Sequence, residues 1–332
     1  HQALFNGFIL TELDTIDITG TVWTTESTDA GDPNVGANKT VKLCVNGTST
    51  STAETDAEGA FSFTGEVVAT DDVVLLYLDD ETENASYVDL AVAGVNMTGI
   101  DLFTDKIVLG SSSEASLTNT NLDVIDANDP TNEDGIAISG GNATFADGYE
   151  VWIVDANTYA PGGDVTADDF EIRGTGAFNA AANGVTISGD YTAAAGSVLT
   201  STGTFTFDGS SAQTVVTGGT DGDHTFGAVT HSGSADLTLS TNGMTVTGVI
   251  TNSGAGDFDT GGLAVTAGGI SVTDGTFNTD ARAGTWDIGT SGVSISASKT
   301  LTATSGTMTV EGDFTDAGTF THNSGTVTFD GS

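Results

Sequence analysis

Val185–Ser210 reads VTISGDYTAAAGSVLTSTGTFTFDGS, and the last residues, Met308–Ser332, read MTVEGDFTDAGTFTHNSGTVTFDGS. The two stretches share the phrase GTxTFDGS, which begins at Gly203 and again at Gly325, an offset of 325 − 203 = 122 residues. A chain that repeats itself in this way is usually one supersecondary unit stacked many times. A residue that recurs in each copy therefore serves the architecture, and a unique residue is the better candidate for chemistry.

The spacing and alternation of the short strands predict the kind of stack. Strands of three to five residues, each followed by Gly, Asp or Asn, begin at Gly256 and Gly275 (275 − 256 = 19) and at Gly306 and Gly325 (325 − 306 = 19). A coil of a parallel β-helix takes about this many residues. Residues two apart in a strand share a face, so the apolar positions are expected to fill the interior and the Thr positions to line the outside. We expect residues 91–332 to form a right-handed parallel β-helix of about ten coils.

The composition favours an all-β fold. The chain has 332 residues with 45 Gly and 3 Pro, is rich in Thr and Ser, and has no convincing apolar run at helical spacing. Thr and Val favour strands, whereas Gly and Asp favour turns. Cys44 is the single cysteine, so no intrachain disulfide forms, which is compatible with an extracellular setting.

The charge excludes some partners. There are 46 acidic residues against 6 Lys and Arg, which gives a formal net charge of −40. Such a polyanion repels phosphate backbones and anionic membrane surfaces, so we expect no nucleic-acid partner. No apolar run is long enough for a membrane span, so we expect no membrane insertion. The acidity either keeps a large surface soluble or binds divalent cations, mainly calcium.

Three phrases carry a resemblance to a known class of repeats. They are TFTFDGSSAQTV (Thr204–Val215), LTLSTNGMTVTGVITNSG (Leu237–Gly254) and TVTFDGS (Thr326–Ser332). This region resembles the Gly/Thr-rich β-solenoid repeats of large bacterial surface proteins, of the adhesin and autotransporter-passenger kind. The resemblance implies a β-solenoid at the cell surface and specifies the fold far better than the function.

A different pattern precedes the repeats. Strands are expected over residues 16–23, 40–45, 60–65 and 73–78, and the phrase ETDAEGAFSF fills Glu54–Phe63. Asp56 and Gly59 are expected to shape a tight turn, with Phe61 and Phe63 alternating into the core. Residues 13–90 resemble the transthyretin-like, carboxypeptidase-regulatory and Cna B-type modules. That resemblance implies an Ig-like β-sandwich that serves as a spacer without enzyme activity.

Residues 1–12 (HQALFNGFILTE) form a markedly apolar segment for so acidic a protein. We expect this segment to cap the chain's own core or to be a strand donated to a neighbouring subunit by β-strand addition. Its first residue is His1, which suggests processing or a fragment, and the last GTxTFDGS phrase stops at Ser332, which suggests a longer native chain or an open edge. The candidate assembly residues are Leu4, Phe5, Phe8, Ile9 and Leu10.

One segment has the composition of a metal loop. Oxygen-bearing side chains at close spacing, closed by an acidic residue and Gly, suit calcium. The spacing lacks the full EF-hand pattern, so an acidic surface loop is the main alternative. No other cofactor is expected. The candidate ligands are Asp126, Asn128, Asp129, Glu133 and Asp134.

The sequence offers no convincing set of catalytic residues. The basic residues of the β-helix region are far apart in sequence, and Asp190 and Asp208 recur as Asp313 and Asp330, which favours corner chemistry over catalysis. His224 and His231, seven apart, lack the spacing of a zinc site and are expected to be solvated or stacked. We therefore expect no enzyme activity and assign no catalytic residue.

Two functions remain. The first is an extracellular or cell-surface structural protein, the subunit of a filament or adhesin stalk that assembles with itself head to tail. The alternative is a carbohydrate-binding or carbohydrate-cleaving β-helix, with surface glycans as partners. The alternative requires a groove with aromatic side chains and paired carboxylates, and the segment with Tyr149, Trp152 and Tyr159 is the nearest match.

Overall fold

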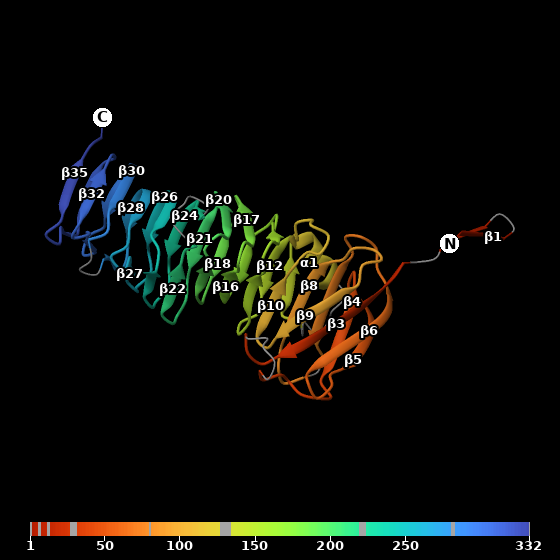
Figure 1. The fold of residues 1–332 in the computed structure, drawn as a ribbon. Coiled ribbons are helices and arrows are strands. Elements are labelled where there is room, and N and C mark those ends of the chain that lie inside the picture. The colour runs from red at the N-terminus through yellow and green to blue at the C-terminus, as the bar shows by residue number, and fades with distance from the viewer. Residues whose placement is uncertain are drawn as a thin grey trace. The chain divides into compact units, whose positions relative to one another are not determined.

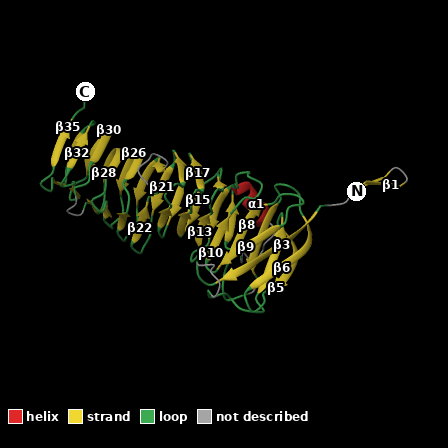
Figure 2. Cartoon of the chain, viewed as in Figure 1, coloured by secondary structure: helices red, strands yellow, loops and turns green. Residues whose placement is uncertain are grey.

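The fold is all-β, with 53% of the chain in strands and 3% in helices. The computed structural model describes residues 2–5, 8–11, 14–26, 32–79, 81–126, 134–218, 224–279 and 283–331, without the side chains of residues 2–5, 8–11 and 49–50. Within these ranges the one helix is α1 (Asn119–Asp126) (Figure 2). The chain forms two compact units: residues 1–117 with 121–136, and residues 118–120 with 137–332.

Two sheets of the first unit share an apolar core. Val22, Leu43 and Leu76 are fully buried in it. β3 pairs with β6 in antiparallel fashion and with β9 in parallel, while β4, β5, β7 and β8 pair antiparallel in the second sheet. The strands are β3 (Thr15–Trp23), β6 (Ala60–Val67) and β9 (Met97–Phe103) in one sheet, and β5 (Thr48–Glu54), β4 (Thr40–Val45), β7 (Val73–Leu78) and β8 (Ser86–Leu90) in the other.

The turn between β5 and β6 forms as the sequence predicts. The Asp56 carboxylate accepts hydrogen bonds from the backbone N–H of Glu58 at 3.0 Å and of Ala60 at 2.9 Å. Gly59 adopts φ +74°, a conformation that L side chains rarely adopt. Phe61 and Phe63, two residues apart on β6, both point into the core, which confirms the expected alternation.

The N-terminal segment forms a hairpin of its own. β1 (Gln2–Phe5) pairs with β2 (Phe8–Thr11), with Leu4 opposite Ile9 and Phe5 opposite Phe8. Among the strands that the structure describes, this two-stranded sheet pairs with no other. A hairpin of two strands is at best marginally stable in water by itself.

A β-solenoid of about 11 turns covers residues 86–329, which confirms the predicted repeat. In the first unit, β10 (Lys106–Leu109) pairs with β8 in parallel, with Ile107 opposite Ser86. In the second unit, from β12 (Asn142–Phe145) onward, every coil passes through three faces in the same order. These coils follow one another from green to blue in Figure 1.

The three faces are defined by parallel stacks of strands. Face 1 holds β12 (Asn142–Phe145), β15 (Val165–Ala167), β18 (Val185–Ile187), β21 (Thr204–Phe207), β24 (Ala228–His231) and β33 (Phe314–Asp316). Face 2 holds β13 (Glu150–Ile153), β16 (Asp169–Ile172), β19 (Tyr191–Ala193), β22 (Gln213–Val216), β25 (Leu237–Ser240), β27 (Phe258–Asp259), β29 (Thr276–Asn278), β31 (Thr300–Thr302) and β34 (Thr319–Thr321). Face 3 holds β14 (Thr158–Tyr159), β17 (Ala177–Ala181), β20 (Val198–Ser201), β23 (His224–Phe226), β32 (Thr307–Val310) and β35 (Thr326–Phe329).

Three long strands join two faces. β26 (Met244–Asn252), β28 (Val265–Val272) and β30 (Trp286–Ile295) each begin on face 3 and continue onto face 1. The register shifts where each strand bends, because residues at the corner fall between two ladders. In these coils the corner between faces 3 and 1 therefore needs no separate loop.

The interior consists of columns of apolar side chains, one residue per coil. Partners in the column of Phe205 lie 20 to 24 residues apart, as 185 − 165 = 20 and 229 − 205 = 24 show. Strand spacing in a sheet sets the rise per coil at about 4.8 Å. The column on face 1 contains Val165, Val185, Phe205, Val229, Ile250, Ile270, Val293 and Phe314.

The two copies of the repeated phrase occupy different faces. In the first copy, Phe205 and Phe207 lie on β21, on face 1, and are fully buried. In the second copy, Val327 and Phe329 lie on β35, on face 3, opposite Met308 and Val310. The repeated phrase therefore specifies one strand and the corner that follows it, and not a complete coil. The same phrase forms a strand on face 1 in one copy and on face 3 in the other.

Candidate functional site

A groove lined by carboxylates runs along the corner between faces 1 and 2. Its volume is about 570 Å³, and its polar wall comes from the corner residues of successive coils. We call it the acidic groove. Its lining residues are Asp147, Asp168, Asp169, Ser188, Gly189, Asp190, Asp208, Gly209, Ser210, Ser211 and Ala212.

Hydrogen bonds between coils hold the groove's carboxylates. Asp169 Oδ1 accepts from the backbone N–H of Asp190 at 2.5 Å, and Asp190 Oδ1 accepts from the N–H of Thr214 at 2.6 Å. Asp168 Oδ1 accepts from the Ser188 hydroxyl at 3.1 Å. Each bond joins one coil to a neighbour, so these side chains connect the corners of successive coils.

The same device recurs away from the groove. Asp164 accepts from the N–H of Gly184 at 2.7 Å, and Asp257 accepts from the N–H of Thr276 at 2.9 Å. A carboxylate that repeats with the coil and binds backbone N–H groups has an architectural role. The role inferred from sequence for the recurring Asp190 agrees with its bond to the next coil.

Crowding of carboxylates changes their proton affinity. Burial is the main cause that raises the pKa of Asp169. The hydrogen bond from the Asp190 N–H lowers this pKa in part, whereas the negative charges of the neighbouring carboxylates Asp168, Asp190 and Glu150 raise it further. Burial also raises the pKa of Asp208. Because the folded state holds these protons more tightly than the unfolded state, both groups favour folding at low pH, and this contribution is lost as the pH rises through the folded pKa.

We expect Asp169→Asn to raise the melting temperature at pH 7–8. The amide oxygen retains an acceptor for the Asp190 N–H and removes one of the crowded charges, a gain of less than about 1 kcal/mol at a partly exposed site. The gain should vanish below about pH 3, where the carboxyl is protonated in both states. Thermal melts across this pH range measure both effects.

Asp155→Asn is the matched control. Hydrogen bonds from the hydroxyl and N–H of Thr175 lower the pKa of Asp155, so this carboxylate stabilises the fold above its unfolded pKa, and the contribution is lost as the pH falls through the folded pKa. Its removal should lower the melting temperature at pH 7. Equal shifts of the same sign in both variants would contradict the electrostatic account of the groove.

The predicted calcium segment lies partly outside the described residues. Asn128, Asp129 and Glu133 fall in the range that the structure does not describe, while Asp126 ends α1. Asp134 is fully buried: its Oδ1 accepts from the N–H of Ile136 at 3.0 Å and its carbonyl oxygen accepts from the Ser86 hydroxyl at 2.7 Å. Across the described ranges, no three His, Cys, Asp or Glu side chains gather in an arrangement that fits a metal ion.

We expect EGTA to leave the melting temperature unchanged. Asp134 Oδ1 and the Asp134 carbonyl oxygen already accept hydrogen bonds from protein groups, so we expect both to keep their geometry without a cation. A fall in melting temperature with EGTA, reversed by calcium and not by magnesium, would overturn this expectation. Differential scanning calorimetry of the full chain is the measurement.

The aromatic residues proposed for a carbohydrate platform are buried. Tyr149, Trp152 and Tyr159 are 6%, 2% and 0% exposed. The Tyr159 hydroxyl donates to Asn119 Oδ1 at 2.5 Å, and the Arg173 guanidinium lies over the Trp152 ring at 3.8 Å. These side chains pack the solenoid and offer no stacking surface for a sugar.

Two histidines that we expected to be solvated or stacked are buried in the solenoid, where the His231 ring packs edge to face against Phe258 at a centroid distance of 6.4 Å. His231 lies on face 1 opposite Phe207, with Nδ1 2.7 Å from Asn252 Oδ1 and Nε2 2.9 Å from the Ala235 carbonyl oxygen. His224 lies on face 3, with Nε2 3.0 Å from Ser197 Oγ. The alternation of β24 could have predicted the burial of His231. Val229 points inward, and a residue two positions later on the same strand shares its face.

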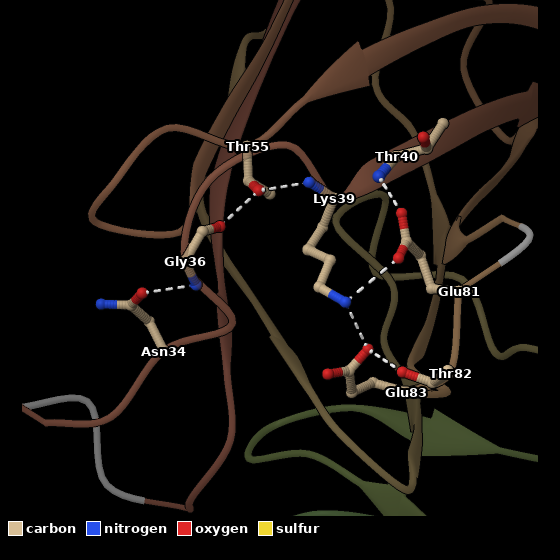
Figure 3. Close-up of polar contacts among 8 residues, drawn as sticks. All are labelled: Asn34, Gly36, Lys39, Thr40, Thr55, Glu81, Thr82 and Glu83. Carbon is tan, nitrogen blue, oxygen red and sulfur yellow. Dashed lines mark hydrogen bonds and ion pairs between the residues drawn. The ribbon is translucent and has the colours of Figure 1, made fainter.

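In the first unit, Lys39 forms a cluster with two glutamates. Its Nζ donates to Glu83 at 2.7 Å and to Glu81 at 3.1 Å, and Glu81 also accepts from the N–H of Thr40 at 2.9 Å (Figure 3). Bonds to Glu83 and Glu81 raise the pKa of Lys39, and bonds from Lys39 and Thr82 lower that of Glu83. The cluster ties the segment after β7 to the start of β4.

Comparisons with known proteins add no assignment. No protein-family model, curated protein or solved structure matches the chain. In the ranges that the structure describes, no helix has the length and apolar character to cross a membrane.

Proposed function

We propose that this chain is an extracellular structural protein, the subunit of a cell-surface filament or adhesin stalk that assembles head to tail without catalysis. The solenoid carries the proposal. Parallel ladders stack its coils along one axis, and the column of Phe205 on face 1 contributes one inward residue per coil.

The solenoid itself supports a structural role. Aromatic rings fill successive coils: Phe205 lies 5.0 Å from Phe226 and 6.0 Å from Tyr191, both edge to face. A closely packed column of parallel strands, right-handed as parallel crossovers are, suits a stalk. The first unit serves as the Ig-like spacer of the transthyretin-like or Cna B-type, supported by its two sheets around one core.

The acidic surface supports an extracellular setting. A formal charge of −40 keeps a long exposed solenoid soluble. The alternative function is carbohydrate binding, with surface glycans as partners at the acidic groove. The carboxylates of the groove could accept hydrogen bonds from sugar hydroxyl groups. The groove's lining includes no aromatic residue, so the structural role is the better supported of the two.

Sedimentation velocity of the full chain over a wide range of concentration tests the proposal. We expect species that lengthen with concentration, and more assembly at 0.5 M than at about 0.01 M salt, because the Debye length falls from about 30 Å to a few Å and screens the repulsion between polyanions. A monomer at every concentration and every salt level would refute the proposal.

A further inference from the structure

His231 is buried on face 1, in the same column as Phe207 of the preceding coil and Asn252 of the following coil. The side chains of His231 and Asn252 are both fully buried. Histidine is the side chain whose charge ordinarily changes near neutral pH. The number of protons that this buried ring carries therefore decides how these coils respond to pH.

The hydrogen bonds of Asn252 fix the direction of its amide. Asn252 Nδ2 donates to the carbonyl oxygen of Gly256 at 3.2 Å and to that of Thr276 at 3.0 Å. Both protons of the amide nitrogen are used in these bonds, and a reversed amide would place its oxygen against two carbonyl oxygens. Asn252 Oδ1, which carries no proton, is therefore the atom that faces the ring of His231.

Both ring nitrogens of His231 consequently face oxygen atoms that can only accept hydrogen bonds. Nδ1 lies 2.7 Å from Asn252 Oδ1, and Nε2 lies 2.9 Å from the carbonyl oxygen of Ala235. These are the distances of two hydrogen bonds. A neutral imidazole has one N–H and would leave a nitrogen lone pair against an oxygen lone pair, whereas the imidazolium donates on both sides.

The charges around His231 lie on the corners outside the column. Its column neighbours Phe207 and Asn252, and the ring of Phe258 that packs against it, carry no charge. In a chain of net charge −40, the field of the surrounding carboxylates favours a proton on the buried ring. The charged residues on the corner segments of its own and the neighbouring coils are Asp208, Asp236, Asp257 and Asp274, of which Asp274 pairs with Lys299.

We propose that His231 is a buried imidazolium that locks three successive coils together, and that this lock opens as the pH rises. The ring joins the corner at Ala235 to Asn252 in the next coil, and Asn252 binds Thr276 in the coil after that. Loss of one proton converts one of the two hydrogen bonds of the ring into an unpaired contact in a fully buried site. This inference adds a pH-sensitive element to the solenoid and does not depend on assembly.

The direction of the pH effect follows from the number of protons in each state. The imidazole of an unfolded chain loses its proton near about pH 6.5. If the folded state keeps that proton, it binds more protons than the unfolded state above this pH, so stability falls as the pH rises. Below this pH both states are protonated, and the contribution of the lock is fully present.

Nitrogen-15 NMR of the full-length chain with labelled histidine counts the protons on the ring. The signals of His231 are identified by their proximity to the Phe258 ring and by their absence from His231→Gln. We expect both ring nitrogens of His231 to carry protons at about pH 7.5, one unit above the value for an unfolded chain. A single protonated nitrogen at that pH, in either tautomer, would refute the proposal.

Thermal melts measure the lock. We expect the difference in melting temperature between the unmodified chain and His231→Gln to change by about 3 °C or more between pH 6 and pH 9, against the unmodified chain at the higher pH, because glutamine does not titrate. Every other titrating group is common to both chains. His322→Gln is the matched control, because His322 is exposed, and its pH profile should follow that of the unmodified chain within about 1 °C.

Each outcome decides the proposal. A constant difference between the unmodified chain and His231→Gln across this pH range, or an equal change of the profile in His322→Gln, would show that His231 is no lock. If His231→Gln does not fold, the NMR spectrum of the unmodified chain still counts the protons, with the ring identified through Phe258. Two protons on the ring, together with a difference that shifts against the unmodified chain at high pH, support the proposal.

Discussion

Phe205→Ala is expected to lower the free energy of unfolding of the solenoid by about 3–5 kcal/mol. Phe205 is fully buried on β21, and its ring contacts Phe178, Tyr191 and Phe226 at centroid distances of 6.2, 6.0 and 5.0 Å. Removal of the ring leaves a cavity in consecutive coils, which the rigid ladders on either side cannot close. Denaturant unfolding followed by circular dichroism measures the loss.

Thr206→Ala is the control for this prediction. Thr206 is the next residue on the same strand, points outward and pairs with Thr186 and Thr230. Its replacement should change the free energy of unfolding by less than about 0.5 kcal/mol. Similar losses for Phe205→Ala and Thr206→Ala would contradict the assignment of inward and outward residues on face 1.

Gly248→Ala is expected to cost about 1–3 kcal/mol through overpacking. Gly248 lies at the bend of β26 between faces 3 and 1, and an added Cβ would sit 2.7 Å from the carbonyl oxygen of Gly227 in the preceding coil. That oxygen accepts a hydrogen bond from the N–H of Gly248 at 2.6 Å, so neither backbone can move away without losing it. The melting temperature and the denaturant midpoint measure the cost.

Gly289 provides a control at the corresponding bend of β30. A Cβ added there meets its nearest atom, the Cα of Gly268, at 3.5 Å, which is ordinary contact. Gly289→Ala should therefore be neutral or stabilising by about 0.4–1 kcal/mol, because alanine reduces the freedom of the unfolded chain. A loss as large as that of Gly248→Ala would show that the bend itself, and not the close approach of coils, requires glycine.

The sequence predicts the local elements well because their signals are local. Alternation places Phe205 and Phe207 inside, and the turn at Asp56 and Gly59 forms as expected. α1 is missed because its amphipathic signal is short: Leu122 and Ile125 are buried, yet the helix has only eight residues.

The face that each strand occupies is not readable from the repeat. GTFTFDGS lies on face 1 at β21 and GTVTFDGS lies on face 3 at β35, although the two phrases are almost identical. Each phrase specifies a strand and a corner, whereas the face depends on the lengths of all coils in between. Those lengths vary, and the long strands β26, β28 and β30 remove a loop from the corner they cross.

The sequence predicts the local chemistry of the candidate site but not the contacts between coils that form it. The recurrence of Asp190 indicates corner chemistry correctly, since its carboxylate binds the N–H of Thr214 in the next coil. The acidic groove itself arises only when the corners of consecutive coils are stacked, and the partners of Lys39 arise only when the segment after β7 meets β4. Contacts between residues distant in sequence depend on strand register, which composition and local spacing do not specify.

Electron microscopy of the purified full chain at high concentration tests the central claim most directly. The account predicts unbranched filaments whose subunits repeat along one axis. Dispersed single particles from the unmodified chain, at every concentration and at both low and high salt, would contradict it.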